Sequence, residues 1–194
     1  MSHVFLDTTV RHKTLSAVTQ AGLVNNLNDG MIWGLLPILL LGLKFNNQDI
    51  GIISGIYPFV WGLAQLYTGK LSDVFSKKRL LFIGMFMQGI AILLLPLFKD
   101  FYTIFIISAC LGLGTAFVYP TFLATIAQYT HPSQRAESVG VFRFWRDLGY
   151  AIGAWTSGLL ADRYGIQYAI IMIGSVTVIS ALIIQIRMPK DQLS

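Results

Sequence analysis

Long hydrophobic runs follow one another along this chain, and only short polar connections separate them. A helix that crosses a bilayer needs roughly 20 mostly apolar residues. Because the connections are so short, the helices have few polar faces to present to water. The pattern therefore predicts an all-α integral membrane protein with six transmembrane helices, at about 16–43, 49–71, 79–98, 101–128, 137–161 and 166–187.

The composition agrees with this interpretation. Apolar residues make up 55% of the 194 residues and charged residues only 12%, whereas an ordinary soluble domain carries about 25% charged residues. A net charge of +5 would be compatible with nucleic-acid binding in a soluble chain. Here the basic residues lie between the hydrophobic runs, so we expect no nucleic-acid partner. Cys110 is the only cysteine of the chain and lies inside an apolar run. A single cysteine excludes an intramolecular disulfide and a cysteine metal cluster. We expect no metal or cofactor.

The basic residues predict how the helices are oriented. If the N-terminus is cytoplasmic, nine basic residues lie on the inner side: Arg11, Lys13, Lys70, Lys77, Lys78, Arg79, Arg135, Arg187 and Lys190. Only three lie on the outer side: Lys44, Lys99 and Arg163. An excess of Lys and Arg marks the cytoplasmic side of a membrane protein. We therefore expect a plasma (inner) membrane protein with a cytoplasmic N-terminal segment (1–15), a helical bundle (16–187) and a cytoplasmic tail (188–194).

A short fragment, Gly-x-Leu-x-Asp, occurs twice, at 69–73 and at 158–162. Three predicted spans separate the two copies, so the copies lie on opposite sides of the membrane. This predicts two inverted three-helix repeats, about 16–98 and 101–187, which is how many secondary transporters are built. Only the first copy is followed by a basic run, because only its loop faces the cytoplasm.

The first copy, GKLSDVFSKKR, resembles the signature loop between the second and third helices of a major facilitator superfamily half. Val74 and Ser76 depart from the pattern, which usually has Arg and Gly there. The matching residues are Gly69, Asp73, Lys77 and Lys78. Members of that family normally have twelve helices, so this chain looks like one half of such a transporter. The stretches NNLNDGMIWGLLP and FRFWRDLGYAIGA look more like the C-terminal half.

The resemblance implies secondary active transport of a small solute by alternating access. It also implies that the partner is the missing six-helix half. The residues leave two alternatives open: a half-length protein that acts as a homodimer, and a six-span membrane scaffold or accessory subunit that transports nothing. An enzyme is the weakest interpretation, because the three histidines are all in loops and no catalytic cluster falls within the spans.

Polar residues on the first span indicate a substrate path. Asn25, Asn28, Asp29 and Trp33 share one helical face, and an ionisable residue at a helix centre costs about 2.5–3.5 kcal/mol in a membrane, so it usually faces protein or water. The resemblance implies that the first and fourth helices line a central cavity. The predicted path is therefore Asn25, Asn28, Asp29 and Trp33 with Phe117 and Thr121, and Asp29 is a candidate for proton coupling. The alternative is that the asparagines brace neighbouring helices, that Asp29 is paired and silent, and that the fourth-span hydroxyls only pack.

The fifth span begins with a charged stretch, FRFWRDLGY. Arg143 and Asp147 are four residues apart and are predicted to pair, with Arg146 one turn from Arg143. The resemblance implies that this helix meets the signature loop of the opposite half. The predicted cytoplasmic gate comprises Gly69, Asp73, Lys77, Lys78, Arg143, Arg146 and Asp147. The alternative is a static Arg–Asp pair whose side chains reach toward the lipid headgroups.

Small residues recur at helical spacing on the second and fifth spans. Glycines at such positions let two helix backbones approach closely in a membrane. We therefore predict a helix-packing seam made of Gly51, Gly55, Gly62, Gly149 and Gly153. The seam and the polar face of the first span suit lipid poorly. Association with the missing half or with a second copy of the chain would cover them.

Overall fold

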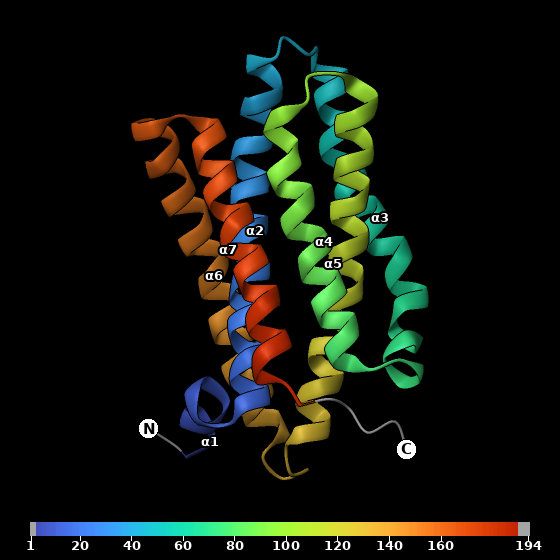
Figure 1. The fold of residues 1–194 in the computed structure, drawn as a ribbon, viewed down its shortest axis with the longest axis vertical. Coiled ribbons are helices and arrows are strands. Elements are labelled where there is room, and N and C mark those ends of the chain that lie inside the picture. Colours follow the sequence, from blue (N-terminus) through green and yellow to red (C-terminus); the bar gives the residue numbers. More distant parts are fainter. Residues whose placement is uncertain (1–2, 190–194) are drawn as a thin grey trace.

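The computed structural model of the chain is a bundle of long helices (Figure 1). It describes residues 3–189, except for the side chain of Asp73. Every regular element in that part is helical. The long helices are α2 (Lys13–Gly42), α3 (Asn47–Val74), α4 (Lys77–Leu94, followed by a 3-10 turn, Leu95–Leu97), α5 (Phe101–Tyr129), α6 (Arg135–Tyr164) and α7 (Ile166–Arg187).

Four of these helices are long and apolar enough to cross a membrane. They are α4 with its 3-10 turn, α5, α7 and most of α3 (Asn47–Ser72). The helices α2 and α6 are just as long, at 30 residues each. They fall short because amide and charged residues interrupt their apolar sequence. Six helices are therefore long enough to be the six predicted spans, and four of these six are also apolar enough to cross a membrane.

Polar side chains fix where several helices begin. Asn46 and Asp100 accept hydrogen bonds from the backbone N–H groups of Asp49 and Thr103, each at 2.9 Å. Such N-caps satisfy donors that have no partner inside the helix. The backbone hydrogen bond from Thr103 also lowers the pKa of Asp100 below its ordinary value. His12 caps α2 in the same way at 3.2 Å, so this helix begins at Lys13, three residues before the predicted start.

The first and last described residues lie at the same end of the bundle, which we call the terminal end (Figure 1). The α3–α4 and α5–α6 connections share that end, and the other three connections lie at the opposite end. In the α6–α7 connection, Gly165 adopts a φ of 96°, which a glycine tolerates without strain. Of the nine basic residues predicted to share a side, eight belong to the terminal end, and Lys190 lies outside the described residues.

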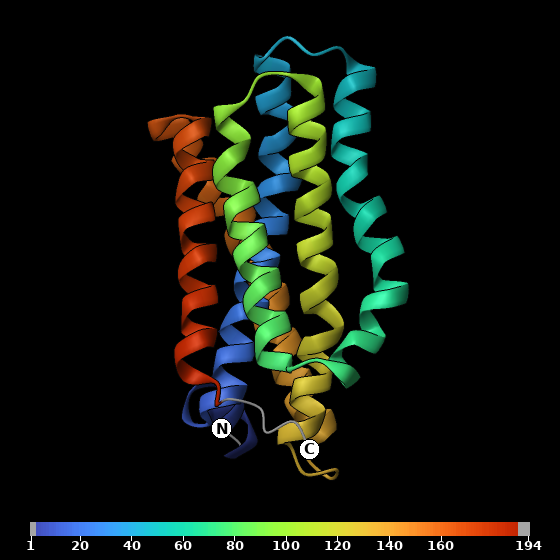
Figure 2. The same cartoon turned by 45° about the vertical axis from the view of Figure 1, so that its right-hand side comes forward.

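The pairs of helices that pack together are arranged symmetrically. Helix α2 packs mainly against α6 and α7, while α5 packs mainly against α3 and α4, and α4 also packs against α7. Exchanging α2, α3 and α4 for α5, α6 and α7 leaves this set of pairs unchanged. Helix α3 lies at the edge of the bundle, on the side away from α7 (Figure 2).

The apolar core forms two layers. One lies toward the opposite end and includes Leu36, Ile92 and Ile170. The other lies toward the terminal end and includes Val18, Phe122 and Ile184. Three buried polar residues, Asn25, Asn28 and Asp29, lie near the middle of α2.

The predicted glycine seam divides into two parts. Gly149 and Gly153 are buried, and a side chain at either would collide with the backbone of α2 at Leu23 and Leu27. These two glycines therefore allow α6 to cross α2 in direct backbone contact. An added Cβ at Gly51, Gly55 or Gly62 would meet none of the described atoms within 4 Å. The α3 part of the seam is thus exposed in the isolated chain.

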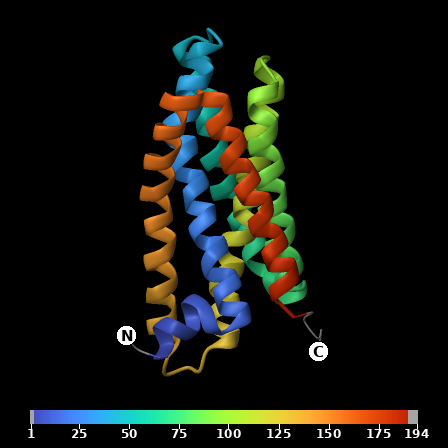
Figure 3. The same ribbon diagram turned by 60° about the vertical axis from the view of Figure 1, so that its left-hand side comes forward.

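The N-terminal segment is folded against the bundle. It forms α1 (His3–Leu6) and a π-helical turn (Asp7–Arg11) beside the N-terminal end of α2 (Figure 3). The carbonyl of Thr8 accepts a hydrogen bond from Thr19 at 3.0 Å, and Trp145 donates to the hydroxyl of Thr9 at 3.1 Å. These contacts attach the segment to both α2 and α6.

Candidate functional site

Asn25 and Asn28 belong to a buried hydrogen-bond network that joins three helices. Gln88 of α4 donates to the side-chain oxygen of Asn25 at 3.1 Å and accepts from the side-chain nitrogen of Asn28 at 3.2 Å. Thr177 of α7 donates to the side-chain oxygen of Asn28 at 2.6 Å. All four residues are buried, so each of these polar groups depends on its protein partners. The contacts match the bracing interpretation for these two asparagines.

Asp29, the next residue along the chain, faces a different set of helices. Its side chain is only 6% exposed and accepts a hydrogen bond from the hydroxyl of Tyr57 on α3. That hydroxyl also lies 3.3 Å from the hydroxyl of Thr115 on α5. Asp29 has no ion pair within the described chain. A buried carboxyl group whose partner is neutral can exist in either protonation state, as proton relays require.

Aromatic rings extend from Tyr57 in two directions. The ring of Trp33, which is 42% exposed, lies 5.9 Å from that of Tyr57. In the other direction, Trp61 stacks on Tyr57 at 6.1 Å, and Tyr119 meets Trp61 edge to face at 6.2 Å. The series therefore connects α2, α3 and α5, and we call it the aromatic series. Large amphipathic rings beside a few polar groups are typical of small-molecule sites.

Arg146 on α6 contacts the last ring of the aromatic series, that of Tyr119. Its guanidinium donates to the hydroxyl of Tyr119 at 2.9 Å and lies 5.5 Å from the centre of that ring. It also pairs with Asp147 at 2.7 Å. The site therefore has a carboxyl group near its centre, an arginine at one end and rings between them.

The predicted pairing of Arg143 with Asp147 is wrong. Within the described chain Asp147 pairs with Arg146, and Arg143 is exposed without an ion pair. A pair four residues apart on a helix contributes only about 0.3–0.5 kcal/mol. The contacts of Arg146 with Tyr119 on the neighbouring helix outweigh such a pair and bring the guanidinium to Asp147.

The other predicted gate residues lie at the terminal end. Lys78 donates to the backbone carbonyl of Met188 at 2.6 Å, so it holds the end of α7. Gly69 and Lys77 are half-buried near the α3–α4 connection. The side chain of Asp73 lies outside the described residues. The structure thus brings Arg146 and Asp147 together and leaves the signature-loop residues at a separate place.

The two predicted residues of the fourth span take no part in the aromatic series. Thr121 is fully buried, and its hydroxyl donates to the carbonyl of Phe117 in the same helix at 2.7 Å. The Cβ of Phe117 lies against Gly84 of α4. The residues of α5 that do contact the series are Thr115 and Tyr119.

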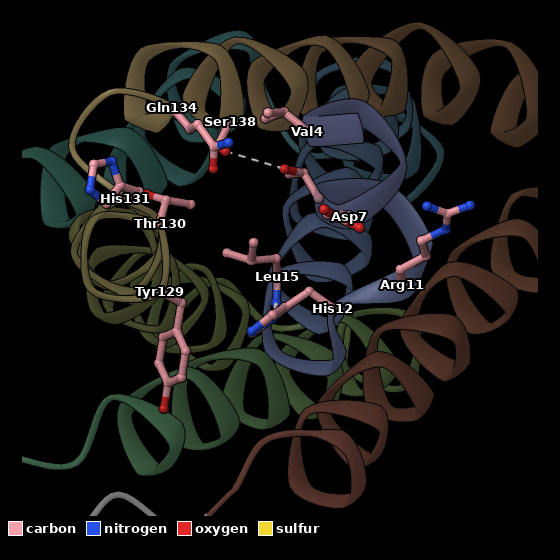
Figure 4. A pocket seen from close by; sticks show the side chains of 11 residues that line it. Val4, Asp7, Arg11, His12, Leu15, Tyr129, Thr130, His131, Gln134 and Ser138 are labelled. Carbon is pink, nitrogen blue, oxygen red and sulfur yellow. Dashed lines mark hydrogen bonds between the residues drawn. The ribbon is translucent and has the colours of Figure 1, made fainter. Parts of the chain in front are cut away.

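A pocket of about 370 Å³ lies at the terminal end, under the N-terminal segment. Asp7, Arg11 and His12 line one side of it, and Tyr129 and His131 line the other (Figure 4). The hydroxyl of Thr8 donates to that of Ser138 across its wall at 3.4 Å. This pocket is separate from the aromatic series, and no sequence motif indicated it.

Sequence reasoning missed five residues that matter here: Tyr57, Trp61, Gln88, Tyr119 and Thr177. Three of them carried a signal. Tyr57 and Trp61 are spaced like neighbours on one helical face, and Gln88 is the one amide within an otherwise apolar span. Tyr119 and Thr177 had no such signal, because their roles depend on which helices pack together.

Comparison with known proteins identifies the family. A model of the Major Facilitator Superfamily matches residues 19–192. An uncharacterized MFS-type transporter from Methanocaldococcus jannaschii is 30% identical over 157 residues, which cover 81% of this chain and 41% of that protein. An inner membrane transport protein from Escherichia coli is 25% identical over 158 residues, covering 81% and 38% of the two chains.

A puromycin resistance protein from Streptomyces alboniger is 27% identical over 181 residues, covering 82% of this chain and 36% of that protein. Among solved structures, a bacterial homologue of the human lysosomal transporter Spinster, in an inward-facing and occupied conformation, has a TM-score of 0.80 at 14% identity. It is matched over 94% of this chain and 45% of its own. The chain spans about two fifths of the length of these curated relatives.

Proposed function

The chain belongs to the Major Facilitator Superfamily, and we propose that it is one six-helix half, from the C-terminal side, of a secondary transporter that moves a small solute by alternating access. Its membership makes it a membrane transport protein rather than an enzyme.

The six-span architecture is supported by the lengths of α2 and α6 and by what covers them. Their polar residues would be costly in lipid. In the bundle, however, Asn25 and Asn28 are enclosed by α4 and α7, and Gly149 and Gly153 of α6 contact α2. The exchangeable pairing of the helices supports two inverted three-helix repeats.

Proton coupling rests on one observation: Asp29 is buried in the middle of the bundle, and its partner is the neutral Tyr57. The substrate path on this chain is Asp29 and Trp33 together with the aromatic series. Trp33 is its exposed end, where a solute would first meet the site. Alternating access would change which end of the bundle reaches Asp29.

The test is solute-driven proton movement in sealed vesicles. The full chain is reconstituted together with its second bundle, and a pH-sensitive dye is enclosed. Puromycin and a hexuronate are suitable first probes, because relatives are named for resistance to the one and transport of the other. We expect a solute gradient to move protons. Uptake of labelled solute without proton movement would refute the coupling, and the absence of uptake across a broad solute panel would refute transport.

The partner proposal rests on the α3 part of the seam. Gly51, Gly55 and Gly62 form an exposed row on an edge helix, and a second bundle or a second copy of the chain would cover it. In mild detergent we expect the chain to associate, either with the second bundle or with itself. A strictly monomeric, well-folded species would count against the transporter and favour the scaffold interpretation.

The proposed orientation places the terminal end in the cytoplasm of the cell, with the bundle in the plasma (inner) membrane. Cysteines introduced at Lys77 and at Lys44, in a Cys110→Ser background, test it. An impermeant thiol reagent added to intact cells should label position 44 and spare position 77, because only the former faces outward. The reverse pattern would require the opposite orientation.

For the gate we propose that Arg146, held by Tyr119 and Asp147, links α6 to α5 when the cytoplasmic side is closed. Arg146→Ala should lower transport per folded molecule by about 5- to 150-fold, the usual range of a conformational coupling. Arg143→Ala is the matched control, since Arg143 is exposed on the same helix and should change transport little. If Arg146→Ala reduces only the amount of folded protein, the arginine is a folding clasp instead.

A further inference from the structure

A second pocket at the terminal end, of about 560 Å³, lies between the beginning of α2 and the end of α7. It adjoins the pocket under the N-terminal segment, because Arg11, His12 and Tyr129 line both. Three cationic side chains line this second pocket: Arg11, Lys13 and Arg187. The described residues that line it include no acidic residue. Its charge therefore favours an anionic ligand.

The positive charges of this pocket have no acidic partner within the described chain. Arg11, Lys13 and Arg187 form no ion pair there, and neither does Asp7 in the adjoining pocket. Arg187 donates to the hydroxyl of Ser16 at 2.8 Å and to a backbone carbonyl of the N-terminal segment at 3.3 Å. These two acceptors are neutral. They fix the position of the guanidinium and leave its charge available to a ligand.

The pocket lies at the depth of the lipid headgroups. Helix α7 has 22 residues and ends at Arg187. At 1.5 Å per residue it is about 33 Å long, which is close to the thickness of roughly 30 Å of the hydrocarbon core of a bilayer. When such a helix crosses the membrane, its last residues reach the boundary between acyl chains and headgroups. Arg187 is therefore placed where lipid phosphates are found.

An apolar row on the outer face of α7 leads to the pocket. Its members follow one another at steps of three or four residues and are 37–82% exposed: Met172, Val176, Ile179, Leu182 and Ile186. Ile186 is the most exposed of them and also lines the pocket. Helix α3, whose glycines we assign to contact with a second bundle, lies on the side away from α7 (Figure 2). The row on α7 therefore faces the acyl chains of the membrane.

We propose that this pocket binds the headgroup of an anionic phospholipid from the adjacent leaflet, while an acyl chain of that lipid lies along the apolar row of α7. Arginine holds a phosphate group by paired hydrogen bonds, and lysine holds it as a compact charge. Basic pockets between transmembrane helices bind such headgroups in other membrane proteins. The bound lipid bridges Arg11 of the N-terminal segment and Arg187 of α7, and so strengthens the attachment of the segment to the bundle.

Native mass spectrometry of the full chain in mild detergent, titrated with dioleoyl phosphatidylglycerol, provides the test. We expect one phosphatidylglycerol to bind per chain, and the zwitterionic dioleoyl phosphatidylcholine to bind about tenfold more weakly. One basic residue contributes about fivefold to the binding of anionic lipid. Replacing both Arg11→Gln and Lys13→Gln should therefore weaken the binding of phosphatidylglycerol about 30-fold. Neither side chain forms an ion pair within the described chain, so the bundle should stay folded.

The double substitution Lys70→Gln and Arg79→Gln is the matched control. It removes two exposed positive charges from the same end of the bundle, and neither residue lines the pocket. We expect it to leave the affinity for phosphatidylglycerol nearly unchanged. Equal weakening by both double substitutions would show diffuse attraction to the basic end and would overturn the proposal.

Two measurements on the unsubstituted chain keep the proposal testable if the variants fail to fold. Equal affinity for phosphatidylglycerol and phosphatidylcholine would refute an anionic site. Inorganic phosphate, added in excess, should leave the lipid bound, because it cannot occupy the apolar row. Displacement of the lipid by inorganic phosphate would instead assign the pocket to a soluble anion. None of these readouts involves transport, so a failure of the proposed function stays distinguishable from a failure of the lipid site.

Discussion

Replacing Gly153 with leucine is expected to prevent the bundle from assembling. A Cβ at this position would fall on the backbone of Leu27, and the backbone of α2 has no alternative rotamer that would relieve the collision. Overpacking in a well-packed core usually costs about 1–3 kcal/mol. Here the two helices themselves must separate, so we expect the cost to exceed that range. The measurement is the fraction of monodisperse protein after size-exclusion chromatography in mild detergent.

Gly158→Leu is the matched control for this substitution. It makes the same change on the same helix, at a glycine whose added Cβ would meet none of the described atoms within 4 Å. We expect its effect to stay within about 0.5 kcal/mol, as at ordinary surface positions. If Gly153→Leu and Gly158→Leu gave equally monodisperse protein, the direct backbone contact between α2 and α6 would be refuted.

Exchanging Asp29 for asparagine is expected to abolish solute-driven proton movement while the protein stays folded. Asparagine keeps the shape of the side chain and an oxygen that accepts the hydrogen bond of Tyr57, but it cannot take up a proton. Positioned proton-transfer groups typically contribute about 10²–10⁴-fold to a rate, and we expect a loss of that order. The vesicle assay described above measures the rate, and thermal unfolding in detergent measures the stability.

The neighbouring substitution Asn28→Ala should show the reverse pattern. Asn28 is as deeply buried, but its partners are Gln88 and Thr177. Removing it leaves the buried side-chain oxygen of Gln88 without its donor, although the hydroxyl of Thr177 keeps its bond to the carbonyl of Ile173. The change should lower the stability by about 1–3 kcal/mol. Proton movement per folded molecule should change little. If Asn28→Ala and Asp29→Asn both lowered stability and neither altered the proton movement, Asp29 would be a structural residue like its neighbour.

Asp29 and Asn28 are neighbours in the sequence but have partners on different helices. They show which contacts a sequence pattern does not predict. Periodicity placed Asn25, Asn28 and Asp29 on one face of a membrane helix and grouped them in one substrate path. The structure separates them, because a face that spans about half of the helix surface contacts several neighbours. The asparagines bind partners on α4 and α7, and the carboxyl group accepts a hydrogen bond from Tyr57 on α3.

The charged residues of the fifth span show a similar limit. The spacing of Arg143 and Asp147 allowed a pair, but local spacing contributes little energy. Arg146 pairs with Asp147 in place of Arg143, because Tyr119 on the adjacent α5 holds the guanidinium of Arg146. The glycines share a helical spacing, but this spacing does not distinguish Gly153, which contacts α2, from Gly55, which is exposed.

The sequence by itself determined the helical class, the approximate helix boundaries, the membership indicated by the signature loop and the side on which the basic residues gather. These follow from local physics: hydrophobic length, capping and the cost of charge in a membrane act within one helix or one loop. Only the tertiary structure decided which helices pair, which polar residues brace the bundle and which surround Asp29. Those outcomes depend on contacts between residues far apart in the chain, and packing selects among them because a buried polar group must find its partner on a neighbouring helix.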